Sequence, residues 1–154
     1  MKGQYFYWYM MLDVFSRKIV GHEVHVAESS ELAALLMRRA SLAEGLTGRP
    51  LVLHSDNGSA MKGATMLVTL EQLGVAASFS RPRVSNDNPY AEALFRTCKY
   101  RPDYPSKPFA SLEEARAWTQ AFVRWYNHQH KHSGLKFVTP AQRHSGQAEV
   151  IMAK

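Results

Sequence analysis

The order of short apolar runs and longer amphipathic stretches most constrains how this chain can fold. Residues 5–14 and 18–26 are apolar or alternating, and a short polar turn separates them, so they predict two strands paired as a hairpin. Helices and short strands then alternate. Their expected ranges are 30–44 (helix), 51–53 (strand), 63–73 (helix), 75–79 (strand), 88–99 (helix) and 111–128 (helix), and a last short helix starts at Thr139-Pro140. This order predicts an α/β fold with a mixed central sheet.

Local signals add detail to these elements. A continuous apolar run at 51–53 predicts a strand that is covered on both faces. Ser111 and Glu114 have the spacing of a capping box. The leucines of the first helix predict its apolar face, and aromatic side chains at helical spacing predict the core stripe of the helix at 111–128. These residues are Leu32, Leu35, Leu36 and Leu42 in the first helix, and Trp118, Phe122 and Trp125 in the later one.

Length and composition exclude several classes of protein. The 154 residues suit one domain with its own core. The one cysteine, Cys98, excludes a disulfide within the chain and a zinc site with several cysteines, and a small buried filler is its expected role. The longest apolar run, Tyr5–Leu12, is far shorter than the roughly 20 residues that span a bilayer. With no signal-peptide cleavage pattern, we expect a cytoplasmic protein.

The net positive charge of the chain lies in its second half. Residues 1–80 hold 7 Lys/Arg and 7 Asp/Glu, whereas residues 81–154 hold 12 Lys/Arg and 6 Asp/Glu, so the whole net charge of +6 lies after residue 80. A basic half suits a polyanionic partner, and nucleic acid is the commonest one. Charge alone supports equally well the alternative that this is a basic soluble protein without a polyanionic partner.

Two carboxylates occupy junctions where a ligand could bind. Asp56 follows the carboxyl end of the strand at 51–53, where ligands bind in open α/β sheets, and Gly58 permits a tight turn there. Glu92 lies near the N-terminus of the helix at 88–99, whose positive end favours a carboxylate. If the two converge, a hard divalent cation such as Mg²⁺ or Mn²⁺ would join them. The alternatives are an Asx turn for Asp56 and a solvated helix residue for Glu92.

Basic residues accompany Glu92. Arg96 and Lys99 follow it at i+4 and i+7, so all three share one helix face and could lie along a DNA backbone. An ordinary Glu–Arg surface pair is the alternative. Arg81 and Arg83, in the polar loop before this helix, could contact phosphates or be solvated. The opposite side of the helix is expected to be buried: Ala91, Leu94, Phe95 and Cys98.

At these residues the chain resembles the integrase catalytic core of DDE recombinases, and especially bacterial insertion-sequence transposases, which are relatives of retroviral integrases. The resemblance covers nearly the whole chain. Its motifs are Leu12-Asp13-Val14-Phe15-Ser16-Arg17-Lys18-Ile19-Val20-Gly21, Leu53-His54-Ser55-Asp56-Asn57-Gly58-Ser59, Asn86-Asp87-Asn88-Pro89-Tyr90-Ala91-Glu92-Ala93-Leu94-Phe95-Arg96-Thr97-Cys98-Lys99, and Trp125-Tyr126-Asn127 with His132-Ser133 and Thr139-Pro140.

The resemblance implies a ribonuclease-H-like fold in which residues 1–145 form the catalytic core and 146–154 a tail. It implies that Asp56 and Glu92 are the second and third metal-binding carboxylates of a Mg²⁺- or Mn²⁺-dependent site. The implied chemistry is cleavage of a DNA strand end and attack of its 3′-hydroxyl on target DNA. The implied partners are transposon ends, target DNA and, in the full-length protein, further copies of the same protein. The implied location is the nucleoid when the protein is bound to DNA, and no membrane is implied. DNA contacts are expected from Arg96, Lys99, Arg81, Arg83 and Asn57.

The chain departs from the family pattern at its beginning. The family's first catalytic aspartate lies on a first strand, which precedes the region matched by residues 5–14, so we expect that strand to be missing and the chain by itself to be inactive. Asp13 occupies the family's second-strand position and is a metal ligand or, more simply, a structural aspartate at a strand end. An inactive DNA-binding or regulatory remnant is the alternative function, and a nuclease that only hydrolyses is a third.

Overall fold

The structure is a computed structural model, and it describes residues 5–45, 51–55, 59–80, 89–131 and 138–145. Strands and helices follow in the predicted order, with one additional short helix after the third strand. The elements are β1 (Tyr7–Leu12), β2 (Ile19–His25), α1 (Ser30–Ala43), β3 (Leu51–Ser55), α2 (Ser59–Lys62), α3 (Ala64–Leu73), β4 (Val75–Phe79), α4 (Pro89–Lys99), α5 (Leu112–His128) and α6 (Pro140–His144).

The described strands form two small sheets instead of one. β1 and β2 pair antiparallel as the predicted hairpin, and β3 and β4 pair in parallel. Within the described ranges no strand bridges β1 and β3. The predicted mixed sheet is therefore present as two halves, because a continuous sheet needs a strand between these two edges.

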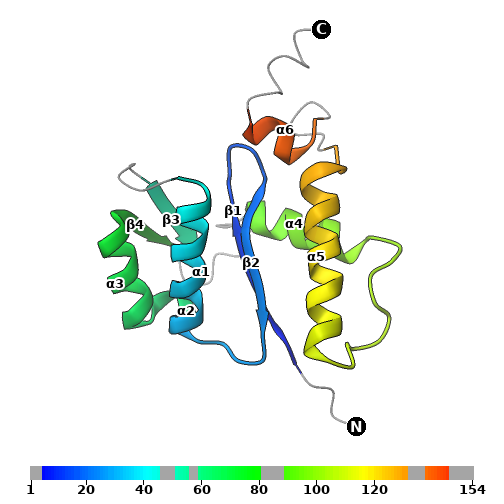
Figure 1. Cartoon of the computed structure of the whole chain (residues 1–154), viewed down its shortest axis with the longest axis horizontal. Helices are drawn as coiled ribbons and strands as arrows, with labels where there is room; N and C mark the ends of the chain where they lie inside the picture. Colours follow the sequence, from blue (N-terminus) through cyan, green and yellow to red (C-terminus); the bar gives the residue numbers. More distant parts are fainter. Residues whose placement is uncertain (1–4, 46–50, 56–58, 81–88, 132–137, 146–154) are drawn as a thin grey trace, which may run out of the picture.

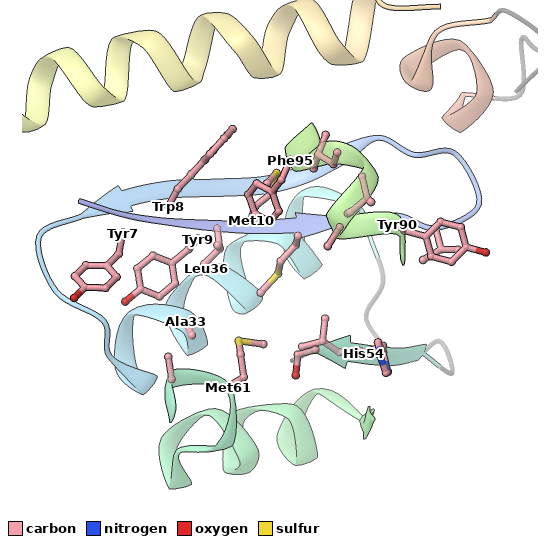
Figure 2. A pocket seen from close by; sticks show the side chains of 18 of the residues that line it. Tyr7, Trp8, Tyr9, Met10, Ala33, Leu36, His54, Met61, Tyr90 and Phe95 are labelled. Carbon is pink, nitrogen blue, oxygen red and sulfur yellow. The ribbon is translucent and has the colours of Figure 1, made fainter. Parts of the chain in front are cut away.

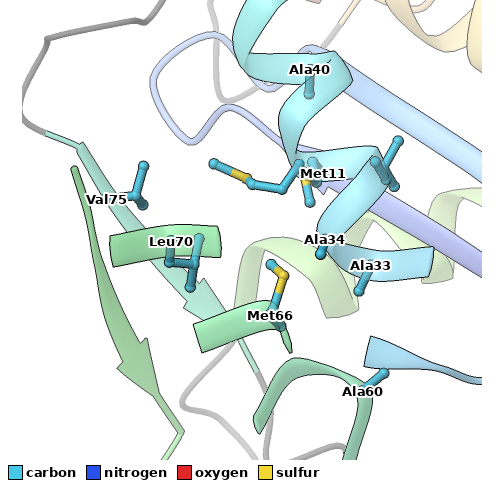
Figure 3. Packing of buried hydrophobic residues seen from close by; sticks show 10 residues of the cluster. Met11, Ala33, Ala34, Ala40, Ala60, Met66, Leu70 and Val75 are labelled. Atoms are coloured by element: carbon cyan, nitrogen blue, oxygen red, sulfur yellow. The ribbon is translucent and has the colours of Figure 1, made fainter. Parts of the chain in front are cut away.

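One apolar layer joins the two halves through α1, α2 and α3. The small side chains of α1 let the helix approach both β1 and α3, and Met66 of α3 is completely buried among them (Figure 3). The prediction for α1 was wrong in part: Leu36 is buried, but Leu35 and Leu42 are 42% and 76% exposed. Alanines form much of the buried face, namely Ala33, Ala34 and Ala40.

A second apolar layer covers the other face of the hairpin. Helices α4 and α5 lie there, on the side opposite α1 (Figure 1). Phe122 and Tyr126 of α5 are almost completely buried, and Trp118 and Trp125 pack partly buried against them, so the predicted core stripe is confirmed. The hairpin thus has helices on both faces.

The prediction that β3 is covered on both faces was wrong. Leu51 and Leu53 pack against the α1–α3 layer, whereas Val52 is 64% exposed. The described helices cover only one face of this strand. A continuous apolar run therefore did not indicate burial on both sides.

Helix ends are capped by hydroxyl side chains. Ser111 accepts a hydrogen bond from the Glu114 N–H at 3.1 Å, but the Glu114 carboxylate accepts from the Ala110 N–H instead of completing the predicted capping box. The complete box is at α6, where Thr139 and Gln142 bond reciprocally. Thr139-Pro140 therefore starts a short helix, as predicted.

Cys98 lies on the buried side of α4 and is 4% exposed. Burial raises the pKa of its thiol to about 11. The side chain thus remains a neutral thiol near neutral pH and acts as the small filler that its sequence position predicted.

None of the helices in the described ranges is long and apolar enough to cross a membrane.

Candidate active site

A cavity of about 610 Å³ lies between the two sheets. Residues along β1 form one wall and residues along β3 form the opposite wall. Helices α1 and α2 contribute Ala33, Leu36 and Met61, and α4 contributes Tyr90 and Phe95 (Figure 2). The cavity therefore meets both segments that the sequence singled out, the end of β3 and the start of α4.

The two predicted carboxylates adjoin residues that line this cavity. Ser55, the last residue of β3, lines it and directly precedes Asp56 in the chain; Ala91 lines it and directly precedes Glu92. Asp56 itself lies outside the described residues. So do the DNA-contact candidates Asn57, Arg81 and Arg83.

Glu92 lies in the first turn of α4 and is exposed. It makes no hydrogen bond or ion pair with the other described residues. Glu92 does not itself line the cavity, but its neighbour Ala91 does. Its exposed carboxylate, which has no partner among the described residues, suits an oxygen ligand for a hard cation.

Arg96 and Lys99 are exposed in the last turns of the same helix, and Leu94 and Cys98 are buried on its other side. Phe95 was predicted to be buried, but it is 40% exposed; it lines the cavity. The helix therefore combines a carboxylate and two cations on its solvent side with an apolar side toward α5.

Within the described ranges, no group of three or more His, Cys, Asp or Glu side chains could hold a metal ion. Of the two predicted ligands only Glu92 is among the described residues. Its carboxylate fits Mg²⁺ or Mn²⁺ chemically, and by itself it is an incomplete donor set.

Sequence reasoning missed a contact that holds the start of α4. The Arg17 guanidinium lies over the Tyr90 ring, 4.1 Å from its centroid. Arg17 is in the hairpin turn with a φ of 63°, a left-handed conformation that is rare outside glycine. This cation–π contact ties the turn to the helix end that carries Glu92. Both residues fall within the family motifs given above, and this is the one feature of the sequence that could have indicated the contact.

Asp13 is held by a structural cluster. Its Oδ2 accepts hydrogen bonds from the Ser16 hydroxyl at 2.6 Å and from the Ser16 N–H at 3.0 Å. His144 of α6 lies with Nδ1 2.9 Å from Ser16 Oγ, and its Nε2 contacts the Glu44 carboxylate. The cluster links the hairpin turn, the end of α1 and α6. These contacts support the structural alternative for Asp13, not metal binding.

We predict that Asp13→Asn makes the free energy of unfolding less dependent on pH in the acid range. Burial alone would raise the Asp13 pKa, but the hydrogen bonds from Ser16 and His144 outweigh burial and hold it below its usual value. The stabilisation is present above the unfolded pKa of about 4 and is lost as pH falls through the folded pKa. The variant should lose roughly 1–2 kcal/mol of unfolding free energy at pH 7.

Urea unfolding from pH 7 down to pH 2 measures this effect. The difference between the natural chain and Asp13→Asn should shrink below pH 4, and Glu71→Gln, which changes an exposed carboxylate, is the matched control. A difference that stays constant over this range would show that Asp13 acts without its charge.

Comparison with known families identifies the class of this domain. Two family models, both described as integrase core domain, match residues 1–85 and 73–140. The first match alone covers more than half of the 154 residues. The chain belongs to the integrase core domain family.

Relatives of the chain are transposases of insertion sequences. It is 32% identical over 133 residues to the transposase for insertion sequence element IS904 of Lactococcus lactis, a match that covers 84% of this chain and 51% of that protein. It is 24% identical over 134 residues to a putative transposase for IS986/IS6110 of Mycobacterium tuberculosis, with 84% and 48% covered. The chain spans about half the length of these curated relatives.

Solved structures confirm the fold class. The catalytic core domain of BIV integrase superposes with a TM-score of 0.67 at 17% identity, over 94% of this chain and 89% of that one. A chain of the simian T-cell lymphotropic virus intasome, solved in complex with PP2A regulatory subunit B56 gamma, superposes with a TM-score of 0.65 at 20% identity, over 89% and 47%. The predicted ribonuclease-H-like fold is therefore confirmed.

Proposed function

We propose that this domain supplies two of the three carboxylates of a site that cuts DNA strand ends and joins them to target DNA. Asp56 and Glu92 would hold Mg²⁺ or Mn²⁺. One observation carries the proposal: the residues directly before Asp56 and Glu92, on β3 and α4, line the same cavity. The names of the relatives, which are transposases, support it.

Bound metal would activate the attacking oxygen and offset charge on the phosphate. The chain's own residues would do the positioning. Glu92 faces solvent in the first turn of α4, and Arg17 stacks on Tyr90 of that turn and restrains the helix end. Arg96 and Lys99 lie further along the exposed side, where they can pair with backbone phosphates.

Further parts of the proposal concern segments outside the described residues or outside this chain. Asn57, Arg81 and Arg83 would add DNA contacts, in keeping with the net charge of +6 after residue 80. Residues 1–145 would form the core and 146–154 a tail. The first aspartate would come from a strand outside this chain, and the working protein would be a multimer that acts on DNA in the cytoplasm.

A strand-transfer assay on labelled DNA ends with Mg²⁺ tests the proposal. The 154-residue chain should give no joined product, and a version extended upstream by the aspartate-bearing strand should give it. Joining by the 154-residue chain would contradict the need for a third carboxylate. Hydrolysis without joining by the extended version would identify a nuclease instead.

A non-catalytic DNA-binding remnant is the second candidate, favoured by the exposed cations Arg96 and Lys99 on α4 and by the net charge of +6 after residue 80. It predicts salt-sensitive DNA binding by the extended version with no joining and no need for Mg²⁺. Arg96→Ala or Lys99→Ala would weaken binding under either function. The metal requirement is therefore the result that separates them.

A further inference from the structure

The turn of the β1–β2 hairpin exposes its apolar side chains and buries a polar one. Val14 and Phe15 are 48% and 61% exposed, whereas Ser16 is completely buried. Hydrogen bonds of Asp13 hold this arrangement: its carboxylate accepts from the Ser16 hydroxyl, and its main-chain N–H donates to the Lys18 carbonyl at 2.9 Å. Polar residues and glycine usually occupy the tip of a turn. A turn that is fixed by its own hydrogen bonds and exposes a phenylalanine therefore offers a rigid surface to a ligand.

Two arginines lie over aromatic rings at this turn. The turn is next to α6 (Figure 1), and Arg143 of α6 lies over the Phe15 ring, 4.2 Å from its centroid. Arg17 lies over the Tyr90 ring at 4.1 Å. Arg143 covers one face of the Phe15 ring, and the large exposed fraction of this side chain leaves the other face open. We call these residues together the turn patch: Val14, Phe15, Arg17, Tyr90 and Arg143.

The two arginines of the turn patch keep their charge available for a ligand. Neither has a carboxylate partner among the described residues. The carboxylates closest in the fold are engaged elsewhere, since Asp13 accepts from Ser16 and Glu44 pairs with Lys18 at 3.4 Å. The turn patch thus combines an open aromatic face with two cations. Proteins bind unpaired nucleotides with this combination, because the ring stacks on a base and the cations pair with its phosphates.

The turn patch adjoins the helix end that carries Glu92. Tyr90 precedes Glu92 by two residues in the first turn of α4, and Figure 2 shows Tyr90 beside the hairpin turn. The inference therefore rests on the proposed function, because a DNA strand end that reaches Glu92 also comes close to Phe15. Bases inside a duplex are stacked on both faces. Only a frayed or overhanging base has a free face to offer, and taking it out of the stack costs least at such a position.

We propose that the turn patch binds an unpaired base at a DNA end: the base stacks on the open face of Phe15, and the neighbouring phosphates pair with Arg17 and Arg143. Every base has a flat π-face, so this contact recognises that an end is unpaired and not which sequence it has. The two cations without a carboxylate partner favour this polyanionic ligand over an apolar segment of another protein.

Two fluorescein-labelled duplexes test the proposal on the 154-residue chain. Both end in a short single-stranded overhang. One overhang carries adenines, and the other has abasic sugars, which keep the phosphates and remove the bases. Fluorescence anisotropy without Mg²⁺ measures the affinity for each duplex. We expect the natural chain to bind the adenine overhang about tenfold more tightly than the abasic one, which is the effect of roughly one stacked base.

Variants of Phe15 supply a test from the side of the protein. Phe15→Ala should abolish the preference for the adenine overhang, because it removes the ring and keeps both arginines, and its affinity for the abasic overhang should change by less than about twofold. Phe15→Trp should keep the preference, since indole also offers a flat face. Tyr5→Ala is the matched control: Tyr5 is an exposed aromatic residue before β1, at the end of the hairpin away from the turn. This control should bind both duplexes as the natural chain does.

Three results would overturn the proposal: equal binding of the two duplexes by the natural chain, a preference that survives in Phe15→Ala, or binding of neither duplex at low salt. If Phe15→Ala fails to fold, Phe15→Leu, which keeps an apolar side chain without the flat ring, takes its place. The outcome is separate from that of the proposed function. A preference for the adenine overhang without joining by the upstream-extended protein contradicts only the function, and joining without this preference contradicts only the stacking.

Discussion

Replacing Glu92 by glutamine in the upstream-extended protein is expected to lower DNA strand transfer by about a thousandfold or more. The substitution keeps the shape of the side chain and removes the charge that would hold the metal. Glu92 is exposed and makes no hydrogen bond or ion pair with the other described residues, so its loss should leave the fold intact. Rates of joined-product formation with Mg²⁺, together with an unchanged unfolding midpoint, measure the effect.

Glu113→Gln is the matched control for this experiment. Glu113 is also an exposed glutamate in the first turn of a helix, but that helix, α5, contributes no residue to the lining of the cavity. Strand transfer by this variant should stay within about twofold of the natural rate, as for an ordinary surface change. Full activity of Glu92→Gln would remove Glu92 from the site, and equal losses in both variants would indicate an indirect effect of helix charge.

Replacing Asn127 by leucine is expected to lower the free energy of unfolding by about 3 kcal/mol. The buried Asn127 side chain serves β2 as a neighbouring strand would. Its Oδ1 accepts from the Ile19 N–H at 2.9 Å, and its Nδ2 donates to the Ile19 carbonyl at 3.0 Å. Leucine has a similar volume but leaves both main-chain groups buried and unpaired, which costs more than the lost bonds themselves.

Urea unfolding at pH 7 measures this loss, and Gln120→Leu is the control. Gln120 is exposed on the same helix, so the same kind of change should shift the unfolding free energy by no more than about 0.5 kcal/mol. A loss below about 1 kcal/mol in Asn127→Leu would mean that Ile19 finds other partners, such as water. The contact would then not be what holds α5 to β2.

The elements themselves were predictable from local sequence. Strand β4 and the ends of α3 and α4 match their expected ranges within a residue, because Gly74 and Pro89 mark the ends of these elements. Leucine content misled the prediction for α1, where Leu42 is exposed and alanines form much of the buried face. Close helix packing selects small side chains, and this preference depends on the neighbouring element.

The exposed face of α4 was predictable from the sequence, but its surroundings were not. Spacing and resemblance identified Glu92, Arg96 and Lys99 on the exposed side of one helix, and the structure agrees. Nothing in the local pattern indicated that Arg17 stacks on Tyr90, because residues far apart in sequence meet through the fold. For the same reason the role of Asp13 became clear only from its contacts with Ser16 and His144.

By itself, the sequence determined the order of strands and helices and the family, and it supplied two candidate carboxylates, since periodicity, capping residues and motifs are local properties of the chain. Only the tertiary structure decided that, among the described residues, β1–β2 and β3–β4 form separate sheets with a cavity between them. Pairing between strand edges depends on which segments meet in space, and main-chain hydrogen bonding across such an edge leaves no mark in side-chain patterns.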